Sequence, residues 1–263
     1  MIWSTSEFAL LAVAIVTYAM VIVIGHKLGQ RRKVQIDQAS IARIAGLQNA
    51  LLGLLALLFG FSIAMSLTRF ETRKDLVLAE ANAIGTAYLR AQVLPEQQRD
   101  EVFSLLRSYA KVRLDFFDAG IDETRLKTAN SQASQIRRQL WAKAISSSKA
   151  STNPVMVGLF IQSLNDVIDI SEKRQVALEN HVPETVTGLL FLVSVAGLGF
   201  IGYSTGLTGV RHHTSTAVFA ILVALVLLVI LDIDRPRRGL IQVSQSSMIR
   251  LQADLAPKGH PGK

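Results

Sequence analysis

Residues 47–67 read LQNALLGLLALLFGFSIAMSL, and the sequence holds no charged residue between Arg43 and Arg69. A helix rises about 1.5 Å per residue, so this stretch would span about 30 Å, the thickness of the hydrocarbon core of a bilayer. The stretch therefore predicts a membrane-spanning helix. Because no proline occurs between Ser40 and Val93, we expect this helix to continue beyond the membrane boundary.

Three further stretches have the same character, at about residues 8–24, 186–203 and 215–231. One such uncharged run could be a buried helix of a soluble protein, but four of them indicate an integral membrane protein. Basic residues follow the first run, which is typical of a retained anchor rather than a cleaved signal peptide. The prediction is two spans within residues 1–68, two within 184–231, and a C-terminal tail at 232–263.

The polar segment at residues 69–183 is periodic. Apolar and small residues recur at a spacing of three or four, as in Val77, Ala81, Ile84 and Tyr88, and this pattern is typical of amphipathic helices. Gly120 and the following Asp122 are suited to end one helix and begin the next. The predicted fold class is therefore an all-α integral membrane protein, with four transmembrane helices and a soluble four-helix bundle between the second and the third.

The formal charge is +8 and the pI is about 10.0. Most of the excess lies beside the predicted spans, above all in a predicted loop at residues 26–46, which indicates contact with lipid headgroups rather than nucleic acid. Short basic loops stay in the cytoplasm, so this loop predicts a periplasmic bundle and tail. Three arginines just after the fourth span favour the opposite orientation: Arg235, Arg237 and Arg238.

The sequence offers no catalytic motif. It contains no cysteine, its five histidines are scattered, and it has no glycine-rich phosphate loop and no nucleophile elbow. We therefore expect no enzymatic activity, no metal site and no cofactor.

The second span carries a stripe of small residues, which are candidates for helix packing or for a position near a pore. Small residues let helix backbones approach closely in lipid, so packing against the first and third spans is the favoured interpretation and pore lining is the alternative. Ser62, Ser66 and Thr68 could hydrate a pore or bond to their own helix. The glycine-rich third span predicts close packing in preference to local unwinding. The stripe consists of Gly46, Ala50, Gly53, Ala56, Gly60 and Ala64.

Two groups of polar residues are further candidates. Glu80 and Asn82 lie near the apolar stripe of the first bundle helix, where a buried polar group needs partners. Asp232, Asp234 and Arg235 follow the fourth span and could bind a divalent ion or anchor the tail to the bundle. An interfacial cluster of ion pairs is the favoured interpretation of the second group.

Two runs, RFETRKDLV at residues 69–77 and EANAIG at residues 80–85, resemble a signature of bacterial bestrophin-like domain membrane proteins. The stretches HVPE at 181–184 and LDIDRPRRG at 231–239 resemble the same family. The resemblance covers essentially the whole chain and implies kinship with bestrophins, oligomeric anion channels with four spans per subunit. Bestrophins have a cytosolic soluble region and a dense acidic calcium clasp after the last span, whereas this chain has only Asp232 and Asp234 there.

Two functions follow as expectations. The first is an oligomeric, bestrophin-like ion channel in the bacterial inner membrane, with the second span nearest the pore. The second is a sensory or scaffold membrane protein whose bundle binds a ligand or partner. The expected partners are the lipid bilayer, further copies of the chain and inorganic ions.

Overall fold

The computed structural model describes residues 7–32, 37–150, 154–209, 213–235, 237 and 239–257. Four helical segments in these ranges are long and apolar enough to cross a membrane: Phe8–Arg32, Ala39–Val93, Pro154–Thr208 and Thr214–Asp234. The described residues are helical apart from the connections, and none of them forms a strand. The all-α class and the four candidate spans agree with the sequence analysis.

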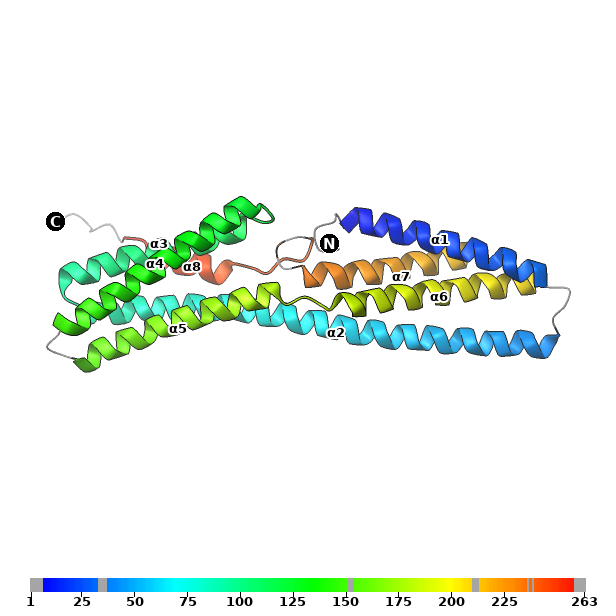
Figure 1. Cartoon of the computed structure of the whole chain (residues 1–263), viewed down its shortest axis with the longest axis horizontal. Helices are drawn as coiled ribbons and strands as arrows, with labels where there is room; N and C mark the ends of the chain where they lie inside the picture. Colours follow the sequence, from blue (N-terminus) through cyan, green and yellow to red (C-terminus); the bar gives the residue numbers. More distant parts are fainter. Residues whose placement is uncertain are drawn as a thin grey trace. The chain divides into compact units, whose positions relative to one another are not determined.

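Figure 1 shows long helices joined by short connections. They are α1 (Glu7–Arg32), α2 (Gln38–Arg90), the 3₁₀ turn η3 (Ala91–Val93), α3 (Glu96–Asp118), α4 (Glu123–Ala150), α5 (Pro154–Glu179), α6 (Glu184–Thr208), α7 (His213–Asp234) and α8 (Ser246–Asp254). At 53 residues, α2 is about 80 Å long and is unbroken, as the absence of proline predicted. The chain forms two compact units, and α2 contributes to both.

Unit 1 contains α1, α2 up to Thr68, α6 and α7. Its core is formed by apolar side chains at helical spacing, including Tyr18, Leu55, Leu198 and Ile230. Many leucine, isoleucine and valine side chains on the same helices are exposed, as expected where lipid rather than water surrounds a helix.

Glycines hold α1 and α6 together. A Cβ atom on Gly202 would lie 2.3 Å from the carbonyl oxygen of Ile22, and one on Gly206 would lie 2.2 Å from that of His26. Gly25 and Gly29 of α1 leave equally little room beside α6. Because α6 is continuous to Thr208, these glycines serve close packing and not local unwinding, as predicted.

Unit 2 contains α2 from Arg69 onward, α3, α4, α5 and α8. Helix α3 packs against α4, and α4 packs against α5. Ile84, Leu106, Phe160 and other apolar residues of the predicted stripes form one core. The turn between α3 and α4 follows the prediction, since Gly120 has a φ of 56° and Asp122 Oδ1 accepts the backbone N–H groups of Thr124 and Arg125.

Two predicted boundaries are wrong. Of the predicted loop at residues 26–46, residues 26–32 belong to α1 and residues 38–46 to α2, because a helix satisfies its own backbone hydrogen bonds and can extend beyond the apolar stretch. Residues 33–36 of that loop lie outside the described residues. Residues 232–263 are also more than a tail: α8 places Met248 in the core of unit 2, and Leu255, just after the helix, joins it there.

Candidate functional site

The small-residue stripe of α2 lies opposite the face by which this helix packs in unit 1. The buried side chains of the span are Leu55, Phe59, Ser62 and Ser66, which recur at a spacing of three or four and so share one side of the helix. At about 100° per residue, the small-residue stripe faces the other side. Its six members are exposed: Gly46, Ala50, Gly53, Ala56, Gly60 and Ala64.

The space beside this stripe is open. Apart from the backbone of α2 itself, a Cβ atom on Gly46, Gly53 or Gly60 would meet no atom of the described residues within 4 Å. The favoured interpretation, packing against the first and third spans, is therefore not what the structure shows. The reason is that α6 uses its own glycines against α1, whereas α2 contacts α6 through larger side chains such as Leu52.

The hydroxyl residues of the second span do not share one environment. Ser62 and Ser66 are buried on the packed face of α2, so they do not lie on the side that carries the small residues. Thr68 is exposed, and its hydroxyl donates to the carbonyl oxygen of Ala64 at 2.9 Å. Of the three, only Thr68 lies on an open face of the helix.

Asp232 and Asp234 bind backbone groups near the end of α7. The two carboxylate oxygens of Asp232 accept the backbone N–H groups of Leu240 and Ile241, each at 3.0 Å. Asp234 Oδ2 accepts the backbone N–H of Val182 at 2.7 Å and lies 3.4 Å from His181 Nδ1. These contacts hold the segment that follows α7 and the connection that precedes α6.

The arrangement gives little support to a metal at this end of α7. Within the described ranges no group of three His, Asp or Glu side chains could hold a metal ion. Asp232 directs both of its oxygens to backbone N–H groups, so they are already occupied. Arg235, the residue after Asp234, is buried. The backbone groups that the two carboxylates bind could not be predicted from the sequence.

Glu80 is at the centre of a buried ion cluster in unit 2. Its carboxylate lies 2.8 Å from Arg113 Nε and 2.5 Å from an Arg174 guanidinium nitrogen. The hydroxyl of Tyr109 donates to Glu80 Oε1 at 3.1 Å, and Arg174 also donates to Gln245 Oε1 at 2.7 Å. The exposed fraction of each charged residue is 4% or less, so water contributes almost nothing to their solvation.

The cluster joins α2, α3, α5 and the segment before α8. Burial alone would lower the pKa of the Arg113 guanidinium, but the Glu80 carboxylate together with Tyr109 and Glu172 raises it. Burial and the Glu80 carboxylate raise the pKa of the Tyr109 phenol. Arg113 therefore stays charged and Tyr109 stays a hydrogen-bond donor. One buried carboxylate thus neutralises part of the charge of two guanidinium groups.

Asn82 does not belong to this cluster, because it lies on the exposed side of α2. The residues predicted from the sequence did not include Arg113, Arg174, Tyr109 or Gln245. A signal for the two arginines was available, since each continues an apolar stripe at helical spacing, Arg113 after Tyr109 and Ala110, and Arg174 after Val167 and Ser171.

Comparison with known proteins agrees with this architecture. The Bestrophin-like domain matches residues 10–248. A crystal structure of a bacterial bestrophin homologue from Klebsiella pneumoniae is similar in fold, with a TM-score of 0.65, 14% sequence identity, and coverage of 95% of this chain and 97% of that chain. A point variant of that homologue gives a TM-score of 0.66 at 13% identity, covering 95% and 98% of the two chains.

None of the curated proteins matches the chain. The solved structures are too distant in sequence to show more than the fold, but the domain match extends over most of the chain and includes all four candidate spans. The chain belongs to the bestrophin-like family.

Proposed function

We propose that this chain is a multi-pass membrane protein that assembles with further copies of itself into an anion channel, with α2 nearest the pore. The observation that carries the proposal is the exposed stripe of small residues on α2, which no other part of the chain covers among the residues that the structure describes. Kinship with bestrophins, which are oligomeric anion channels, makes anion conduction the expected activity.

The shape of the stripe supports assembly. In lipid, helices associate through close backbone approach at small residues, because no hydrophobic force drives one apolar helix against another. A face that offers glycine or alanine at six positions is suited to a symmetric contact between copies of α2 around an axis. Helices arranged in this way would line a narrow path on that axis.

The charges support passive anion movement over proton-coupled transport or catalysis. The predicted spans contain no Asp, Glu, Lys or Arg, and an intramembrane ionisable group is what proton-coupled transport requires. Arg43 is exposed near the beginning of α2 and precedes the uncharged stretch. In an assembly it would form a ring of guanidinium groups, which favours anions at a pore entrance.

We further propose that the protein lies in the bacterial inner membrane and that unit 2 forms a soluble domain outside the bilayer. A buried cluster of charged side chains is supported more readily by a water-exposed helical domain than by lipid. For orientation we retain the prediction of the positive-inside rule, in which the connection between α1 and α2 is cytoplasmic and unit 2 periplasmic. Labelling of Ser104→Cys in intact cells tests this orientation, because the chain has no cysteine of its own.

The channel proposal is tested with purified protein. We expect a multiple of the 28.7 kDa chain mass in detergent, and a chloride current in planar bilayers. Gly53→Leu places a large side chain on the open face and should reduce the current without unfolding the protein. Leu54→Ala, on the next residue and away from the stripe, is the matched control. A monomeric mass with no current for common anions and cations would contradict the proposal and favour the sensory or scaffold alternative.

A further inference from the structure

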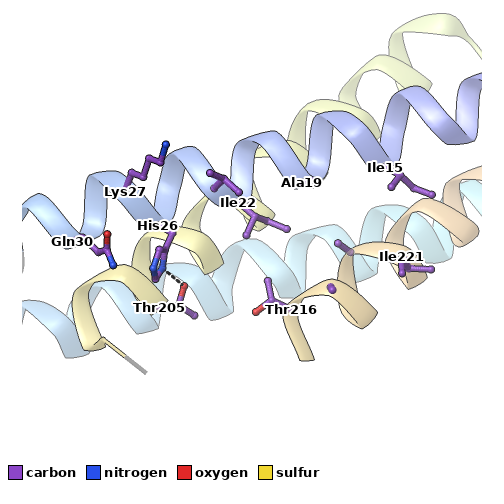
Figure 2. Close-up of a pocket in the computed structure, with 12 residues that line it drawn as sticks. Ile15, Ala19, Ile22, His26, Lys27, Gln30, Thr205, Thr216 and Ile221 are labelled. Carbon is purple, nitrogen blue, oxygen red and sulfur yellow. Dashed lines mark hydrogen bonds between the residues drawn. The ribbon is translucent and has the colours of Figure 1, made fainter. Parts of the chain in front are cut away.

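Unit 1 contains a cavity between α1 and α7 that the proposed channel function does not use. Its volume is about 410 Å³, within the range of pockets that hold small molecules. The tight glycine contact fixes α1 against α6, and α7 completes the other wall. Figure 2 shows the residues that line it.

The lining changes character along α1. From Ile15 through Ala19 to Ile22 the wall is apolar, and the facing residues of α7 include Ala217 and Ile221. This part covers about 10 Å of α1 at 1.5 Å per residue, and it lies within the first predicted span. It is suited to one stretch of a hydrocarbon chain.

At its other end the cavity is polar. His26, Lys27 and Gln30 line it from α1, and Thr205 lines it from α6. The ring of His26 is hydrogen-bonded to the hydroxyl of Thr205 at 3.3 Å, the contact drawn as a dashed line in Figure 2. These residues follow the apolar stretch directly, where the headgroups of a bilayer begin. The lysine makes this end positively charged, and Arg31 and Arg32 follow it in the sequence.

We propose that this cavity binds an anionic glycerophospholipid. One acyl chain lies between Ile15 and Ile221, and the phosphate lies at the ammonium group of Lys27. Along the cavity, the apolar wall is followed by a cationic end, in the same order as the acyl chain and the headgroup of such a lipid. Long basic side chains reach the headgroup level while their stems remain in apolar surroundings. A zwitterionic lipid could fill the apolar part but would gain less at Lys27.

The test uses the full-length protein in detergent, titrated with phosphatidylglycerol or with phosphatidylcholine of identical acyl chains, and native mass spectrometry to count the bound lipids. We expect the wild-type protein to retain phosphatidylglycerol more strongly, and Lys27→Gln to weaken this retention about fivefold. Arg31→Gln is the matched control, because this exposed basic residue lies one turn further along α1 and does not line the cavity.

A second variant tests the apolar part. Ala217→Phe should fill the cavity and reduce retention of both lipids, whereas Val218→Phe, on the adjacent exposed residue outside the cavity, should not. Equal retention of the two lipids by the wild type, or an unchanged preference in Lys27→Gln, would overturn the proposal. So would a change of oligomeric mass in Ala217→Phe with lipid retention intact, because the cavity would then be a contact between copies. Each outcome is independent of whether the protein conducts ions.

Discussion

The two parts of α2 differ in whether residues of the same chain contact their key side chains. From Arg69 onward, the helix places the Glu80 carboxylate against two guanidinium groups and a phenol of the same chain. Up to Thr68, one side of the same helix presents glycine and alanine to open space. The first arrangement is complete within one copy of the chain, whereas no other described part of the chain covers the second.

The glycines of unit 1 make the same distinction with one residue type. Gly202 and Gly206 of α6 are in contact with the backbone of α1, so their lack of a side chain is used within the chain. Gly53 and Gly60 of α2 have no described neighbour beside them outside their own helix. Glycines in a span of this protein can therefore either pack against a neighbouring helix or face open space. Which of the two occurs depends on whether another helix lies beside them.

The largest effect is expected from breaking the complete part of α2. Glu80→Gln would leave Arg113 and Arg174 buried without a counter-charge, and loss of one partner of a buried ion pair costs about 3–5 kcal/mol. The free energy of unfolding, measured by denaturant titration, should fall by this amount. Glu71→Gln, at an exposed residue on the same helix that pairs with Lys74 at 3.8 Å, is the control and should change it by less than about 0.5 kcal/mol. If Glu80→Gln also changed the free energy of unfolding by less than about 0.5 kcal/mol, the cluster would contribute no stability.

A smaller change in the free energy of unfolding is expected at the two sets of glycines, and its sign should differ between α6 and α2. Gly202→Ala places a methyl group against the carbonyl of Ile22 and should lower the free energy of unfolding by about 1–3 kcal/mol. The methyl group of Gly53→Ala would meet no described atom within 4 Å outside the backbone of α2, and alanine has the higher helix propensity, so this variant should raise the free energy of unfolding by about 0.5–1 kcal/mol. Thermal unfolding in detergent measures both. A destabilising Gly53→Ala would show that another surface packs closely against this face, either within the chain or between copies.

The smallest effect is expected from calcium at the end of α7. Because Asp232 directs its oxygens to the backbone N–H groups of Leu240 and Ile241, millimolar calcium or a chelator should leave the melting temperature unchanged. Asp232→Asn should still lower stability, since it removes one of two acceptors for these N–H groups and costs about 1–3 kcal/mol. A calcium-dependent rise in melting temperature that Asp232→Asn abolishes would identify a metal site here.

Much of the fold could be predicted because it depends on local chemistry. The uncharged run at residues 47–67 indicates a span, and the lack of proline up to Val93 indicates the continuous α2. The turn at Gly120 and Asp122 has its own signal in those two residues. Helix α8 was not predicted, although Met248, Leu251 and Leu255 have helical spacing, because nine residues are too few for a clear periodic pattern.

The candidate site was less predictable because it depends on which helices become neighbours. Glu80 could be identified as a polar residue near an apolar stripe, but its partners Arg113 and Arg174 are 33 and 94 residues away in the sequence. The small-residue stripe could also be identified, yet periodicity gives only the face of a helix and not what lies opposite it. The glycines of α2 and α6 look alike in sequence and differ only in tertiary contact.

The most direct test of the central claim places a single cysteine on the open face of α2. Gly60→Cys and the control Leu54→Cys are well suited to this, because the chain has no other cysteine and both positions are exposed. The current through each variant is recorded in planar bilayers before and after a charged, water-soluble thiol reagent is added. If α2 lines an ion path, the reagent should block Gly60→Cys and leave Leu54→Cys unchanged. A measurable current that the reagent leaves intact in Gly60→Cys, or blocks equally in both variants, would contradict the assignment of this face to the pore.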